Sequence, residues 1–298
     1  DPTLTAIRMA AADEIIAATD AVLATDATPE RLAALIEVRL AETPRNWLAL
    51  DALTDLVAER GIALPVSLLR RVSEARADDF SLLSQASACA LCAYDPAQCS
   101  LSQVMMCQAP VALTPVGDIA GVTRAGVAYV SGEPIDQVDV GLSVVGLGAP
   151  AAVLGSGGTS VVVKAGASLA KLARRMGRVS PKLAEMAVTA AKEGVDWAAL
   201  PAARSVDDIS AAIRADAFAP LTATLSDLER LRAATDATTA LHLLPLVDDA
   251  KDARSLAAAA EALGPRLIGR AEVLGKARLF RATLRVSETA WMLISGLS

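Results

Sequence analysis

Histidine and aromatic residues are scarce in this sequence of 298 residues, which holds one His, three Trp, two Tyr and three Phe. One His leaves almost no material for a catalytic triad or for a zinc or haem site with histidine ligands. We expect that residue, His242, to be a partly buried packing residue. Few aromatic side chains leave little with which to stack bases or sugars. The net charge of −6 also argues against a nucleic-acid partner, which needs clustered Lys and Arg. The sequence indicates no metal ion and no cofactor.

Hydrophobic residues are abundant instead. They make up 53% of the chain, alanine is frequent, and the mean hydropathy is +0.42. Intrinsic disorder requires low hydrophobicity and is therefore excluded. A mean hydropathy this high indicates either an unusually apolar helical protein or one that associates with a membrane.

Capping signals predict helices along most of the chain. Thr28-Pro29, Thr43-Pro44 and Ser180-Pro181 each place a hydroxyl before a proline at the first helical position. We expect about five short antiparallel helices within residues 1–93 and similar helices in the last third. The sequence therefore predicts an all-α protein, an irregular multi-helix bundle with a Gly-rich apolar central hairpin.

Three segments are expected. Residues 1–109 form an N-terminal helical bundle with a Cys-rich junction, residues 110–178 a Gly-rich apolar central segment, and residues 179–298 a C-terminal helical bundle. Residues 140–163 contain no charged residue and are long enough to span a bilayer, but glycines and Pro150 interrupt them. Three readings of this stretch are open: a buried helical hairpin, a membrane-inserting or re-entrant hairpin, and short strands around residues 161–163.

All four cysteines fall within a short stretch, at Cys89, Cys92, Cys99 and Cys107. Two disulfides that join the first pair to the second are favoured, because a bridge between residues three apart in one helix is geometrically awkward. A four-cysteine zinc site and a redox-active C-x-x-C pair are the alternatives. Disulfides would indicate an oxidising compartment.

Ser168 and Lys171 fit the motif S-x-x-K, in which a lysine helps to activate a serine nucleophile. The other motifs of that enzyme class, S-D-N and K-T-G, are missing. The pair is therefore a weak catalytic candidate, and the chain is more simply explained as a protein that is not an enzyme.

Two basic stretches lie beside apolar ones and suit contact with anionic lipid or a protein partner. The first contains Arg174 and Arg175, and the second contains Arg270, Arg278, Arg281 and Arg285. Trp291 opens an apolar C-terminal run that could be the start of a membrane helix. Basic residues beside a membrane helix usually mark the cytoplasmic side, whereas the cysteines favour an oxidising one. We give the cysteines more weight.

The sequence thus predicts a non-enzymatic envelope protein, periplasmic or on the outer face of the inner membrane and anchored there. A start at Asp1 rather than Met is consistent with a removed signal peptide or anchor. We expect a membrane-anchored or membrane-apposed helical scaffold whose partner is membrane lipid or an envelope protein, with an oligomer possible. The alternatives are a membrane-inserting protein that handles lipid or forms a pore, and a serine hydrolase or transferase that uses Ser168 and Lys171.

Overall fold

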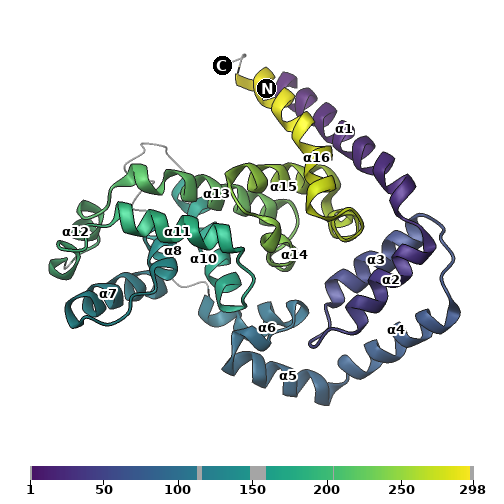
Figure 1. The fold of residues 1–298 in the computed structure, drawn as a ribbon, viewed down its shortest axis with the longest axis horizontal. Coiled ribbons are helices and arrows are strands. Elements are labelled where there is room, and N and C mark those ends of the chain that lie inside the picture. The colour runs from purple at the N-terminus through teal and green to yellow at the C-terminus, as the bar shows by residue number, and fades with distance from the viewer. Residues whose placement is uncertain (1, 113–115, 148–158, 204, 296–298) are drawn as a thin grey trace. The chain divides into compact units, whose positions relative to one another are not determined.

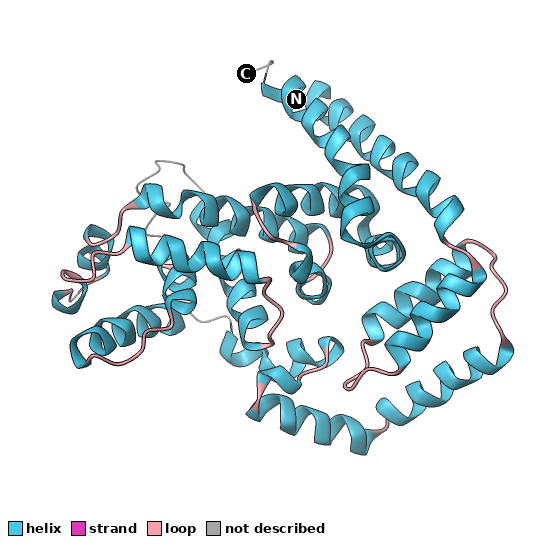
Figure 2. Ribbon diagram, viewed as in Figure 1, coloured by secondary structure: helices cyan, strands magenta, loops and turns pink. Residues whose placement is uncertain are grey.

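A computed structural model of the chain describes residues 2–112, 116–147, 159–203 and 205–295, and every regular element in these ranges is a helix (Figure 2). The predicted all-α class is confirmed. The short strand considered around residues 161–163 is wrong, because these residues lie within helix α10 (Thr159–Arg175). None of the helices in the described part of the chain is long and apolar enough to cross a bilayer.

The chain divides into two compact units. The first contains Asp1–Cys107, Ala234–Leu243 and Ser255–Ser298, and the second contains Gln108–Ala233 and Leu244–Arg254. This division differs from the three segments expected from the sequence, because the last helix packs against the first and third helices.

The first unit is built on the helices of the N-terminal third, where the sequence predicted about five helices and the structure has five within residues 2–94. Its elements are α1 (Pro2–Asp26), α2 (Pro29–Leu40), α3 (Trp47–Glu59), α4 (Val66–Asp79), α5 (Leu82–Tyr94), η1 (Pro96–Gln98), the first part of α6 (Leu101–Ala112), α14 (Ala237–Leu243), the latter part of α15 (Ala250–Leu263), η4 (Gly264–Arg266) and α16 (Leu267–Ser295) (Figure 1). Leu32, Ile36, Leu50 and Leu53 are fully buried where α2 and α3 pack together.

The first residues of α2 and α3 show which of the predicted N-cap residues cap a helix. Thr28 accepts a hydrogen bond from the amide of Arg31 and caps α2, as predicted. Thr43-Pro44 does not begin a helix, which corrects the prediction. Asn46 caps α3 instead, because its side chain accepts from the amide of Ala49.

The second unit is packed around one buried helix, α8 (Gln137–Gly146). Its elements are α7 (Val116–Ser131), α8, α10, α11 (Pro181–Gly194), η2 (Leu200–Ala202), α12 (Val206–Ala211), most of α13 (Ala215–Ala234) and η3 (Leu244–Leu246). Helix α8 is buried almost along its whole length and packs against α7, α10 and α11. Gly141 allows the closest of these approaches, since a Cβ atom there would lie 2.5 Å from the carbonyl oxygen of Ala187. Residues 148–158, which would join the two halves of the predicted apolar hairpin, lie outside the described residues.

Candidate interaction site

The four cysteines form two bridges, and each joins the first pair to the second, as the sequence favoured. Cys89 is joined to Cys107 with their Cα atoms 5.6 Å apart, and Cys92 to Cys99 with their Cα atoms 4.4 Å apart. The bridges fasten α5 to the residue that follows η1 and to the middle of α6. With every cysteine paired, the structure supports neither the four-cysteine zinc site nor the redox C-x-x-C pair. Disulfides of this kind are typical of proteins in oxidising, extracytoplasmic compartments.

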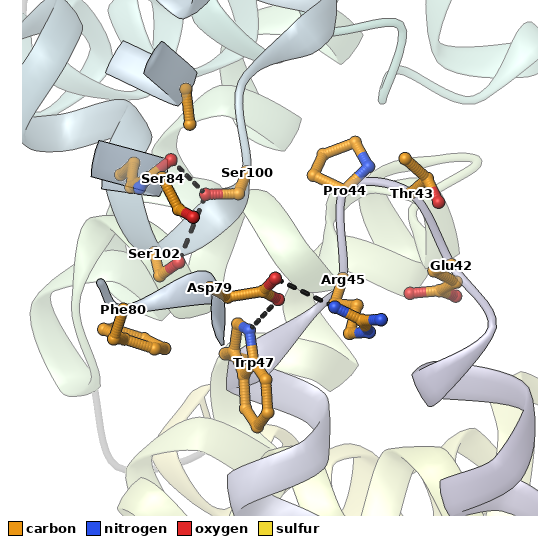
Figure 3. A pocket seen from close by; sticks show the side chains of 12 residues that line it. Glu42, Thr43, Pro44, Arg45, Trp47, Asp79, Phe80, Ser84, Ser100 and Ser102 are labelled. Carbon is orange, nitrogen blue, oxygen red and sulfur yellow. Dashed lines mark hydrogen bonds and ion pairs between the residues drawn. The ribbon is translucent and has the colours of Figure 1, made fainter. Parts of the chain in front are cut away.

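A cavity of about 310 Å³ lies beside this junction (Figure 3). Asp79 accepts hydrogen bonds from Arg45 and from the indole nitrogen of Trp47, both at 2.8 Å. Ser100 donates to the side-chain oxygen of Gln103 at 3.0 Å. Glu42, the remaining charged residue of the lining, is paired with Arg39. The charged groups of this cavity are therefore engaged by the protein itself, and we place no ligand there.

Ser168 and Lys171 lie one turn apart in α10, as their spacing requires. The Ser168 hydroxyl donates to the carbonyl oxygen of Lys164 at 3.0 Å. A serine that bonds back to the preceding turn is an ordinary feature of helices. The structure thus places the pair on one helix and adds no feature that would activate the serine.

The residues predicted to contact lipid or a protein partner belong to two different units of the fold. Arg174 and Arg175 end α10 in the second unit, where Arg174 lies 3.4 Å from a carboxylate oxygen of Asp136. Arg285 and Trp291 belong to α16, but their side chains lie outside the described residues.

Arg270 lies in the interior of the first unit. Its side chain is 1% exposed, and Nη2 lies 2.9 Å from Asp20 Oδ1 and 2.9 Å from Glu59 Oε1. Burial works against the charged guanidinium, but the hydrogen bonds and charges of Glu59 and Asp20 outweigh it, and the pKa of Arg270 is raised. This correction removes Arg270 from the surface residues expected to contact lipid or a partner, because its charge is used inside the fold.

Arg278 and Arg281 are the predicted contact residues that the structure brings together. Both line a groove of about 510 Å³ between α1 and α16, which lie side by side in Figure 1. We call this the α1–α16 groove, and its other lining residues are Glu14, Ala17, Ala18, Val22 and Ala282. We call its apolar lining residues, Ala17, Ala18, Val22 and Ala282, the floor of the groove, and its charged lining residues the rim.

The charges on the rim are unequal. Arg278 is ion-paired with Asp26. On the α16 side Arg281 is exposed and has no ion partner among the described residues, and on the α1 side stands Glu14. A groove of this kind can bind an apolar surface that carries negative charge along its α16 edge.

The sequence identified the arginines of this groove but missed its floor. Ala17, Ala18 and Val22 lie on the first helix, far from the arginines in the chain, and their alanines carry no chemical signal. Only the packing of α1 on α16 creates the groove.

The structure contains further evidence that α16 is not one straight basic face. Gly275 interrupts it with φ 67° and ψ 170°, a left-handed φ that favours glycine. Arg270 therefore lies before the break, and Arg278 and Arg281 lie after it.

Comparison of the chain with known proteins finds no matching family model, no matching curated protein and no matching solved structure.

Proposed function

We propose that this protein is a non-enzymatic helical interaction module of the cell envelope, periplasmic or on the outer face of the inner membrane. It binds an acidic amphipathic helix of an envelope protein in the α1–α16 groove. The observation that carries the proposal is the apolar floor of this groove beside Arg281, which has no ion partner in the described part of the chain.

The shape of the site favours a helix over a lipid surface. A groove between two helices is concave, and an amphipathic helix lays its apolar side into such a groove through residues spaced three and four apart. A bilayer presents a broad surface that a concave site contacts only at its rim. Small side chains such as Ala17, Ala18 and Ala282 let a third helix come close to both walls.

The charge on the rim sets the chemistry of the partner. Arg281 offers a guanidinium that a Glu or Asp carboxylate can pair with in two parallel hydrogen bonds. Because Arg278 already pairs with Asp26, Arg281 is the residue we expect to select an acidic partner.

The disulfides support the proposed location. Two bridges within residues 89–107 would be reduced in a cytosol and persist in an oxidising compartment. A scaffold apposed to the membrane, as the sequence suggests, is compatible with a groove that takes an envelope protein.

The proposal is tested with a synthetic amphipathic peptide that has apolar residues at helical spacing flanked by Glu, labelled for fluorescence anisotropy. The full oxidised chain should bind it, and Arg281→Glu should weaken binding roughly 3- to 10-fold, since a rim ion pair contributes about 1 kcal/mol. Binding should also weaken as salt rises.

Arg214→Glu is the matched control, because Arg214 is also exposed, does not line the groove, and undergoes the same charge change. Equal losses in the two variants, or equal binding of a peptide flanked by Lys, would contradict the proposal. Flotation with phosphatidylglycerol vesicles completes the test. If the wild type binds vesicles but not the peptide, and Arg281→Glu abolishes the vesicle binding, the groove binds lipid instead of a helix.

A further inference from the structure

The outer face of α5 has an unusual composition for an exposed helix. The helix has the sequence LLSQASACALCAY and contains no charged residue. Leu82, Leu83, Leu91 and Tyr94 are 90%, 83%, 59% and 91% exposed. We call these residues, together with the exposed Ala86, Ser87, Ala90 and Ala93, the α5 face. Contiguous apolar surface of this kind marks a contact with another molecule.

The disulfides hold this face outward. Cys92 lies on the opposite side of α5 and is bonded to Cys99, and Cys89, at the edge of the α5 face, is bonded to Cys107. Cys92 is fully buried. The helix therefore cannot rotate to bury its leucines without breaking covalent bonds. A surface fixed in advance loses little conformational entropy when a partner binds.

We propose that the α5 face is the contact surface for a second copy of this chain, and that two chains pair through antiparallel α5 helices about a two-fold axis. This inference concerns a surface separate from the α1–α16 groove and does not depend on the proposed function.

The charge distribution favours a second copy as the occupant. A two-fold contact sets a surface against an identical surface, so that every charge on it meets like charge. The chain as a whole carries a net charge of −6, yet the α5 face carries none. This face can therefore meet its own copy without electrostatic repulsion.

The order of large and small residues along α5 suits antiparallel pairing. Leu83 and Leu91 lie equally far on either side of Ser87, so an antiparallel pair that crosses at Ser87 sets Leu83 of each chain against Leu91 of the other. Ala86, Ser87 and Ala90 at the crossing allow the two helix backbones to approach closely.

A lipid surface is a poorer match for the same face. Helices that lie in a membrane interface carry Lys or Arg on their polar side, and α5 has neither. The arginines of the preceding helix α4 are already ion-paired, Arg70 with Glu74, Arg71 with Glu37 and Arg76 with Asp51.

The amount of exposed apolar surface is also sufficient. Three leucines, one tyrosine and four small residues together expose an area on the order of the 800 Å² that each partner contributes to a standard interface. The nearby Phe80, 44% exposed at the end of α4, can add to the contact.

The test is sedimentation equilibrium of the full oxidised chain from about 1 to 100 µM. The mass of a chain is 30.6 kDa, and the wild type should approach twice this value as concentration rises. The double variant Leu83→Glu, Leu91→Glu should raise the dimer dissociation constant roughly a hundredfold, since four carboxylates would then face one another.

A second double variant separates loss of contact from loss of folding. Leu83→Lys, Leu91→Lys should also be monomeric by itself, and mixing it with the Glu variant should restore a dimer by opposite charge. Val127→Glu, Val130→Glu on α7 is the matched control, because these valines are 60% and 70% exposed and lie off the α5 face.

The outcomes are clear in either direction. A wild type that stays monomeric at 100 µM overturns the proposal, as does a dimer that only the α7 variant disrupts. Failure of the Glu and Lys variants to pair when mixed would show that α5 faces do not meet. If the wild type is monomeric and floats with phosphatidylcholine vesicles, and the Glu variant does not float, the α5 face binds lipid instead.

Discussion

At the scale of single residues, the interior of the first unit contains a buried polar network that joins distant parts of the chain. Glu272 of α16 is 5% exposed and lies 2.9 Å from Nε2 of His242 and 2.7 Å from Nη2 of Arg39. His242 is buried, as the sequence suggested, but it has a specific partner that the sequence did not reveal. A buried carboxylate is tolerated because several donors replace the water it loses.

This network predicts a pH dependence of stability. Burial raises the pKa of Glu272, but the hydrogen bond and charge of His242 and those of Arg39 more than offset it, so that the pKa lies below its usual range. As the pH falls toward the unfolded pKa of about 4.3, the Glu272 carboxylate is protonated more often in the unfolded chain than in the folded one. The stability contributed by Glu272 is thus complete above about pH 4.3 and is lost as the pH falls through the folded pKa.

Glu272→Gln tests this expectation. It should lower the free energy of unfolding by about 2 kcal/mol at pH 7 and make it fall less steeply than the wild type below pH 5. Urea denaturation across pH 3–7 measures both effects. Glu74→Gln is the control, because Glu74 is 65% exposed and should leave the profile unchanged. Parallel profiles for the wild type and Glu272→Gln would contradict the assignment.

At the scale of elements, close helix packing in the second unit depends on individual glycines. Gly166 of α10 faces α13, and a Cβ atom there would lie 1.9 Å from the carbonyl oxygen of Leu225. A carbonyl in a helix cannot move aside as the end of a flexible side chain can. The two helices must therefore separate if any side chain is added at this position.

Gly166→Ala should lower the free energy of unfolding by about 3 kcal/mol, which is a cost typical of overpacking a core. Gly126→Ala on α7 is the matched control, since its nearest neighbour is 3.7 Å away and alanine favours helices. That control should be neutral or stabilise the fold by up to about 1 kcal/mol. Thermal or urea denaturation gives the comparison, and equal effects of the two substitutions would refute the packing argument.

At the scale of the whole molecule, the disulfides couple the fold to its compartment. The bridges close loops with sequence separations of 7 and 18 residues, and each should stabilise the fold by roughly 2–3 kcal/mol by restricting the unfolded chain. A protein that depends on these bridges is expected to fold fully where thiols oxidise.

Alkylation of denatured protein tests this expectation. Protein purified without reductant should take up no iodoacetamide, and protein treated with reductant should take up four labels by mass spectrometry. Reduction should also lower the midpoint of urea unfolding. Four reactive thiols before reduction would contradict the disulfides and the extracytoplasmic location that they support.

The sequence by itself determined the local structure of this protein. Thr28 and Ser180 cap helices where the sequence placed them, because a cap depends only on residues within one turn. The spacing of the cysteines predicted that bridges join the first pair to the second, since an i,i+3 bridge is awkward in a helix. Which cysteine of the first pair bonds to which of the second was decided by the fold. Even Thr43-Pro44 failed for a local reason, because Asn46 is also a capping residue and stands closer to the apolar stretch.

The tertiary structure alone decided what those helices do. Arg270 and Arg281 are the same residue type on one helix, but one is enclosed by Asp20 and Glu59 and the other stands at a groove. The floor of that groove comes from a helix at the other end of the chain. The leucines of α5 are apolar like those of the core, yet Leu82, Leu83 and Leu91 are exposed in the folded chain. Burial and exposure depend on which distant helices pack together, and in this alanine-rich chain the residue types alone do not specify that packing.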